Sequence, residues 1–192
     1  DLDGRLSSAA DCVSNCLATL ADAVAARTRR VGSVVGDDSL FPDQRWSPGM
    51  SWNNIPTAYG TAVSALTLDD NEVPLLVTPG AAGQPPAVEL TPYYAIQNSA
   101  VTVATGKTEL NIDRLPLERT IRLTGTIAAG SKPEVIRLGI DDPAHYAAWR
   151  LKTLLEARGV RVSGGIEARH RPFAPSDDPK LRGGTPPVRP PL

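Results

Sequence analysis

The chain has few of the residues that usually carry covalent or metal chemistry. Its 192 residues include two histidines and two cysteines. His145 and His170 are therefore the only imidazoles available to a serine–histidine–aspartate arrangement. Cys12 and Cys16 have no further histidine or cysteine nearby, and on a helix they would share one face, where a bridge requires distortion. We therefore expect free or incidental thiols, no metal site and no cofactor.

Long apolar runs and an excess of one charge are also missing. No apolar stretch approaches the roughly 20 residues that a bilayer-spanning helix needs. The formal net charge is −1, and the 20 basic residues are not clustered. The sequence therefore predicts no transmembrane segment and no nucleic-acid partner. It also lacks a recognisable signal peptide, and because it starts at Asp1 without a methionine we expect a processed or excised piece.

Two segments combine a helix pattern with a Val-rich strand pattern that follows it. Residues 17–27, LATLADAVAAR, have apolar residues at helical spacing, and RRVGSVVG comes next. Near the other end, Asp142 and Pro143 predict a helix start, and Gly159 predicts its end. Residues 160–166, VRVSGGI, then form a predicted strand. The similarity of the two units indicates one α/β layer.

Between these units the pattern changes to short β-type segments separated by turn signals. The segments are SALTL, PLLV, AVEL, AVTVAT, ELNID, TIRLTGTIA and EVIRLGI. The predicted fold class is therefore an α/β (α+β) domain with a nested all-β insertion domain. We assign residues 1–63 plus 131–170 to the α/β domain, 64–130 to the β-rich insertion, and 171–192 to a Pro-rich linker.

The stretch VGDDSLFPDQRWSPGMSWNN contains the candidate binding residues. Asp37 and Asp38 are adjacent, so they point to opposite sides of a strand and do not form an acid–base pair. Either they cap a turn, or one carboxylate meets a ligand amine next to Phe41. Trp46 and Trp52 are expected to hold this irregular loop to the core.

Neither histidine is favoured as a catalytic group. His145 falls in the first turn of the second predicted helix and is interpreted as a solvated residue. His170 falls in the basic run EARHRP, where the predicted tail begins. The sequence therefore predicts no catalytic residue.

Several short motifs, in order, resemble those of the class C low-molecular-mass penicillin-binding proteins. These DacB-like bacterial enzymes are D-alanyl-D-alanine carboxypeptidases/endopeptidases. The similar elements are a V-x-D-x-S-x-F turn at 35–41, a tryptophan loop at 48–54, Tyr59, the strand start SALTLDDNEV at 64–73, and the helix–strand unit at 141–166. The resemblance covers about residues 17–166.

The family's catalytic motifs are absent. Penicillin-recognising enzymes use Ser-x-x-Lys, Ser-x-Asn and Lys-Thr-Gly. No serine of this chain has a lysine three residues later, Lys107 begins Lys-Thr-Glu, and Ser51 fits Ser-x-Asn only inside the tryptophan loop. The resemblance therefore implies a non-catalytic insert region, lying between the first and second catalytic motifs of a parent enzyme.

The resemblance also implies a site and partners. Asp37, Asp38 and Phe41 would lie at the rim of the parent's active-site cleft, facing the peptidoglycan stem peptide. A carboxylate there can pair with the free amine of a diaminopimelate side chain. The implied partners are this peptide and the transpeptidase-like catalytic domain of the parent chain, in the periplasm or extracytoplasmic envelope. Two alternatives remain: a stand-alone envelope module that binds muropeptides or a protein, and a hydrolase with unrecognised serines.

Overall fold

The computed structural model, which describes residues 15–181 and 183, divides the chain into two units. The first, here the α/β unit, takes its described residues from Asp1–Ser47, Val63–Asp70 and Asp142–Leu192. The second, the β unit, consists of Pro48–Ala62 and Asn71–Asp141. The predicted mixed α/β fold class is confirmed.

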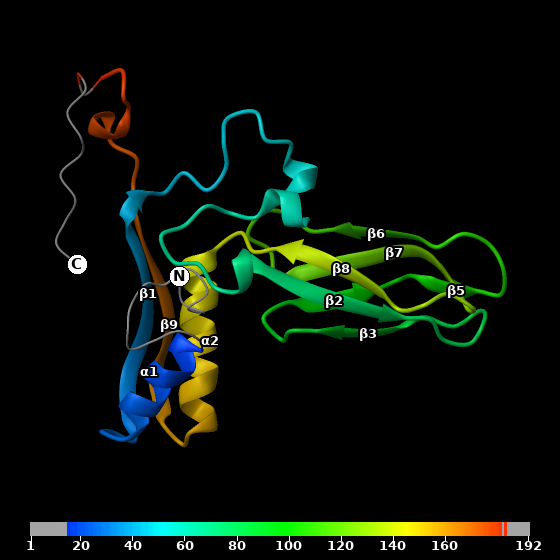
Figure 1. Cartoon of the computed structure of the whole chain (residues 1–192), viewed down its shortest axis with the longest axis horizontal. Helices are drawn as coiled ribbons and strands as arrows, with labels where there is room; N and C mark the ends of the chain where they lie inside the picture. Colours follow the sequence, from blue (N-terminus) through cyan, green and yellow to red (C-terminus); the bar gives the residue numbers. More distant parts are fainter. Residues whose placement is uncertain (1–14, 182, 184–192) are drawn as a thin grey trace. The chain divides into compact units, whose positions relative to one another are not determined.

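Two long parallel strands and two helices form the α/β unit. Strand β1 (Arg30–Pro42) pairs with β9 (Arg161–Arg171), and Figure 1 shows helices α1 (Cys16–Ala25) and α2 (Pro143–Ala157) beside this pair. Alternate β1 residues turn toward the helices, as the pleat of a strand requires. The buried core cluster consists of Ala21, Val34, Ala148, Leu155 and Val160.

Helix α2 begins and ends where its sequence predicts. The Asp142 carboxylate accepts a hydrogen bond from the His145 backbone N–H at 2.9 Å, and Pro143 occupies the first turn. Gly159 adopts a φ of 75°, the left-handed conformation that terminates many helices. The helix then packs closely on β1, since a Cβ atom at Gly36 would lie 2.0 Å from a backbone oxygen of the helix.

Two small sheets build the β unit. Strands β2 (Glu72–Thr78), β3 (Ala87–Leu90) and β8 (Glu134–Gly139) form an antiparallel sheet in the order β3-β2-β8. In the other sheet, β7 (Thr120–Ala128) pairs in parallel with β4 (Ala95–Asn98) and β5 (Val101–Val103), and antiparallel with β6 (Glu109–Asp113). Fully buried side chains come from both sheets: Val73, Leu75, Val77, Ile121, Leu123, Ile127 and Leu138.

A charged pair is also buried in the β unit. The Arg114 side chain is inaccessible, and its guanidinium donates to the Gly139 carbonyl at 2.9 Å and lies 3.5 Å from Asp141. The guanidinium also stacks over the Tyr94 ring, 4.6 Å from the ring centroid. Asp141 in turn accepts from the Tyr94 hydroxyl and the Leu117 backbone N–H. This network ties together segments that are far apart in the sequence.

The unit boundaries differ from the predicted domain boundaries. Residues 48–62 and 131–141, assigned from the sequence to the α/β domain, lie in the β unit because β8 pairs with β2 and Thr57 bridges Leu138. Residues 64–70 lie instead in the α/β unit. The SALTL segment there was wrongly predicted to be a strand, and it is an irregular loop.

Other predictions also needed correction. Strand β9 extends to Arg171, so the predicted linker 171–192 begins inside it. Arg171 then makes two hydrogen bonds to Asp177, at the end of the short 3-10 helix Pro175–Asp177. Cys16 is disulfide-bonded, so the prediction of a free thiol was wrong at this position. Cys12 lies outside the described residues.

Within the part of the chain that the structure describes, no helix is long and apolar enough to span a membrane.

Candidate functional site

The two adjacent aspartates lie in β1 and have opposite environments. Asp37 is exposed on β1, and Phe41, which lies where the β1–β9 pairing becomes irregular between Asp37 and Pro42, is 45% exposed. Asp38 lies on the inward face and is 8% exposed. Of the three predicted binding residues, Asp37 and Phe41 are therefore surface residues, and Asp38 is buried.

Asp37 is a surface carboxylate whose ionised form is stabilised by hydrogen bonds. One of its oxygens accepts from the Ser39 backbone N–H at 3.0 Å, and the other accepts from Arg169 at 3.0 Å across the β1–β9 pair. Hydrogen bonds from Ser39, with a smaller contribution from Arg169, lower the pKa of Asp37 below its usual value. The group is therefore ionised at neutral pH, and a carboxylate with about four lone-pair sites can accept further donors.

An apolar groove of about 170 Å³ borders Asp37. Its walls come from α1, β1, α2 and the loop at Leu66, and two of its side chains, Leu20 and Val35, are 48% and 42% exposed. The groove combines one carboxylate with an otherwise apolar lining: Leu17, Leu20, Val34, Val35, Gly36, Leu66, Ala147, Ala148 and Leu151. This arrangement suits an aliphatic chain that ends in a cation.

Asp38 has a structural environment instead. One oxygen lies 2.8 Å from Nδ1 of His170, and the other accepts from the Ser64 hydroxyl at 2.9 Å. Nε2 of His170 lies 2.9 Å from an Arg45 guanidinium nitrogen and 3.4 Å from an Asp142 carboxylate oxygen. A neutral ring that donates from Nδ1 and accepts at Nε2 satisfies both Asp38 and Arg45.

This buried cluster joins β1, β9, the start of α2 and two loops, but it is not a hydrolytic triad. A triad requires the serine hydroxyl to bond to the imidazole. Here the Ser64 hydroxyl bonds to Asp38, so no base activates it. This cluster was not predicted, because His170 was assigned to the start of a tail, whereas strand β9 carries the residue inward. The alternation of β9 could have revealed this, had the strand been extended past Ile166.

The tryptophan loop is anchored differently from the prediction. Trp52 is 57% exposed, so the expectation that it holds the loop to the core was wrong, whereas Trp46 is half-buried. The buried residues of this segment are Ile55 and Pro56. Trp52 starts a short 3-10 helix, Trp52–Asn54, whose outward position leaves its indole at the surface.

Comparison with known proteins gives consistent results. The family model of the D-Ala-D-Ala carboxypeptidase 3 (S13) family matches residues 6–181. A D-alanyl-D-alanine carboxypeptidase of Actinomadura sp. (strain R39) is 33% identical over 160 residues, which cover 78% of this chain and 30% of that relative.

Solved structures show the same fold. Penicillin-binding protein 4 (dacB) from Haemophilus influenzae superposes with a TM-score of 0.67 at 16% identity, covering 83% of this chain and 37% of that one. A structure of the same protein complexed with a β-lactam gives a TM-score of 0.53 at 13% identity, covering 82% and 34%. The chain thus spans about a third of the length of the relatives it matches. On this sequence and structural similarity, the chain belongs to the D-Ala-D-Ala carboxypeptidase 3 (S13) family of DacB-like penicillin-binding proteins.

Proposed function

We propose that this chain is the non-catalytic insert region of a serine-type D-alanyl-D-alanine carboxypeptidase/endopeptidase that acts on peptidoglycan. One observation carries the proposal: residues 6–181 match the S13 family, while the chain has neither Ser-x-x-Lys nor Lys-Thr-Gly. Chemistry would then be supplied by a transpeptidase-like catalytic domain of the parent chain. This chain would shape the cleft in which the stem peptide lies.

The outward face of β1 supplies the binding chemistry in this proposal. The ionised Asp37 carboxylate pairs with the side-chain ammonium of a diaminopimelate residue, and the apolar groove beside it covers the aliphatic stem. Phe41 offers a further exposed apolar side chain near the end of the same strand. Asp38 holds the strand in place from the inward side and has no direct ligand role, because it is buried and its oxygens bond to His170 and Ser64 inside the unit.

We further propose an extracytoplasmic location in the cell envelope. The disulfide at Cys16 supports it, since disulfides persist in oxidising compartments. The substrate class of the S13 family, whose name refers to the D-Ala-D-Ala terminus of wall peptides, agrees with this location.

Labelling with a fluorescent β-lactam tests the absence of a catalytic serine. The chain should show no covalent label and no release of D-alanine from a D-Ala-D-Ala peptide, because no serine in it has its family's lysine partner. Covalent labelling of any serine, or turnover of the peptide, would refute the insert-region proposal. A full-length penicillin-binding protein processed in parallel shows that the probe is active.

Titration with a stem peptide tests the role of Asp37. In ¹H–¹⁵N spectra, a peptide with a free side-chain amine should shift the signals of Asp37 and Phe41, and Asp37→Asn should abolish these shifts. Asp113→Asn, which changes an exposed carboxylate of the β unit, is the matched control. Contact should persist from pH 7 to about pH 4 and disappear only as Asp37 becomes protonated, because its pKa lies below the usual value of about 3.9.

The same titration separates the insert region from a stand-alone binding module. One wall of a shared cleft should bind the peptide only at millimolar concentration, whereas a complete module should bind it in the micromolar range. Absence of any shift at millimolar peptide would contradict both the module and the role assigned to Asp37.

A further inference from the structure

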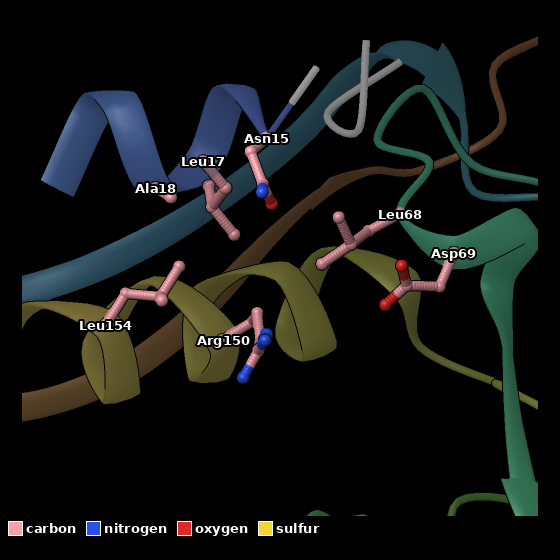
Figure 2. Close-up of a pocket in the computed structure, with 7 residues that line it drawn as sticks. All are labelled: Asn15, Leu17, Ala18, Leu68, Asp69, Arg150 and Leu154. Carbon is pink, nitrogen blue, oxygen red and sulfur yellow. The ribbon is translucent and has the colours of Figure 1, made fainter. Parts of the chain in front are cut away.

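A second cavity lies in the α/β unit, between the first turn of α1, helix α2 and the turn at Asp69. Its volume is about 80 Å³, which is room for roughly five to eight water-sized spheres. Figure 2 shows Asn15 and Leu17 extending from α1 toward α2, with Asp69 at the neighbouring turn. The lining residues are Asn15, Leu17, Ala18, Leu68, Asp69, Arg150 and Leu154.

Three polar groups with unused bonding capacity border this cavity. Asn15 precedes α1 in the left-handed conformation, with φ 54°, and its side chain makes no capping bond. Within the described residues, the Arg150 guanidinium has no carboxylate partner, and Asp69 uses one oxygen, which accepts from the Tyr146 hydroxyl at 3.3 Å. A cation, an anion and an amide therefore surround a floor formed by leucines.

The Asp69 carboxylate lies at a turn with unusual backbone conformation and accepts one hydrogen bond, from the Tyr146 hydroxyl. Asp69 and Asp70 both adopt left-handed conformations, with φ of 53° and 56°. Consecutive non-glycine residues rarely adopt this region, and such local strain is concentrated at functional sites. The hydroxyl of the buried Tyr146, which projects from α2, holds the carboxylate on the cavity side of the turn.

We propose that this cavity binds a small α-amino acid as its zwitterion. The ammonium group pairs with Asp69, the carboxylate pairs with the forked guanidinium of Arg150, and the side chain lies on Leu17 and Leu68. A cavity of about 80 Å³ has room only for a small ligand, which restricts the side chain to a short aliphatic group, as in glycine or alanine. A carboxylate or an amine alone leaves one charge at the cavity unpaired, which gives selectivity for molecules that carry both. This site shares only Leu17 with the groove beside Asp37, and it does not depend on the proposed function.

Titration of the whole chain with alanine tests the site, with both enantiomers as separate arms. Signals of Leu17, Leu68 and Arg150 should shift with a Kd on the order of 1 mM, as expected for a ligand with so few atoms. Saturable binding of either enantiomer supports the site. N-acetylalanine and ethylamine, each with one of the two charges, should bind about tenfold more weakly or worse.

Two substitutions locate the binding. Asp69→Asn keeps a residue type that tolerates positive φ, and Arg150→Gln keeps the stem of the side chain. Each should weaken alanine binding about tenfold or more, with the far-ultraviolet dichroism unchanged. Arg137→Gln, at an exposed arginine of the β unit, is the control and should bind like the unmodified chain. The proposal is overturned by absence of shifts at about 100 mM alanine, or by equal binding of the N-acetyl compound.

Discussion

Replacement of the two adjacent aspartates one at a time separates a buried anchor from a surface group. Asp38→Ala removes two hydrogen bonds to a buried carboxylate, from His170 at 2.8 Å and from Ser64 at 2.9 Å. Bonds to a charged group contribute about 1.5–3 kcal/mol each, so their loss costs about 3–6 kcal/mol. Relief of the desolvation of Asp38 offsets part of this. We expect a net loss of about 2–4 kcal/mol in the free energy of unfolding.

Asp37→Ala is the matched control for this measurement. The same residue type is removed from the same strand, but the Asp37 side chain is 39% exposed and that of its partner Arg169 is 66% exposed. Exposed ion pairs contribute about 0–1 kcal/mol. We therefore expect Asp37→Ala to leave the urea midpoint almost unchanged.

Equilibrium unfolding in urea, followed by far-ultraviolet circular dichroism, measures the difference. With a slope of about 2 kcal/mol per M, a loss of about 3 kcal/mol moves the midpoint down by about 1.5 M. Asp38→Asn keeps an acceptor for one partner and should fall between Asp38→Ala and the unmodified chain. Equal midpoints for Asp37→Ala and Asp38→Ala would show that the buried cluster does not stabilise the unit, and the reasoning would fail.

Two further substitutions test the packing. Gly36→Ala should cost about 1–3 kcal/mol or more in urea unfolding, because its Cβ would lie 2.0 Å from a helix oxygen, while Gly32→Ala, with no atom within 4 Å, should cost less than about 1 kcal/mol. Asp141→Ala should cost about 3–5 kcal/mol, because it leaves the buried Arg114 guanidinium without its carboxylate. Thermal unfolding monitored by tyrosine dichroism checks the prediction for Asp141→Ala. A decrease of the melting temperature by less than about 2 °C would contradict it.

Local chemistry made the α2 boundaries predictable from the sequence. The Asp142 cap and the Gly159 terminator depend on neighbours within four residues, so the sequence contains all that is needed. Most β segments of the β unit were also predicted correctly, since alternation and turn residues are local signals. The strand prediction for SALTL was wrong because this segment is an irregular loop with partly buried apolar residues. Alternation of apolar residues alone does not distinguish such a loop from a strand.

Long-range contacts made the candidate site harder to predict. The inward turn of His170 depends on the length of β9, and that length depends on pairing with β1 more than a hundred residues earlier. The exposure of Trp52 likewise depends on which residue of its loop reaches the core, and the smaller Ile55 takes that place. The burial of His170 and the exposure of Trp52 therefore depend on tertiary contacts, which local sequence patterns do not contain.

The arrangement of the two aspartates connects stability with the proposed binding role. Successive side chains of a strand point to opposite faces. Asp38 therefore supplies a carboxylate to the core, and its neighbour Asp37 supplies one to the surface. The inward carboxylate of Asp38 fixes β1 against β9 and the start of α2, and two walls of the groove beside Asp37 come from β1 and α2. A ligand at Asp37 therefore meets a surface whose shape is set from behind, by groups that it does not touch. Binding geometry of this kind needs a rigid scaffold more than additional ligand contacts, and the buried cluster around Asp38 supplies that scaffold beneath the exposed Asp37 carboxylate.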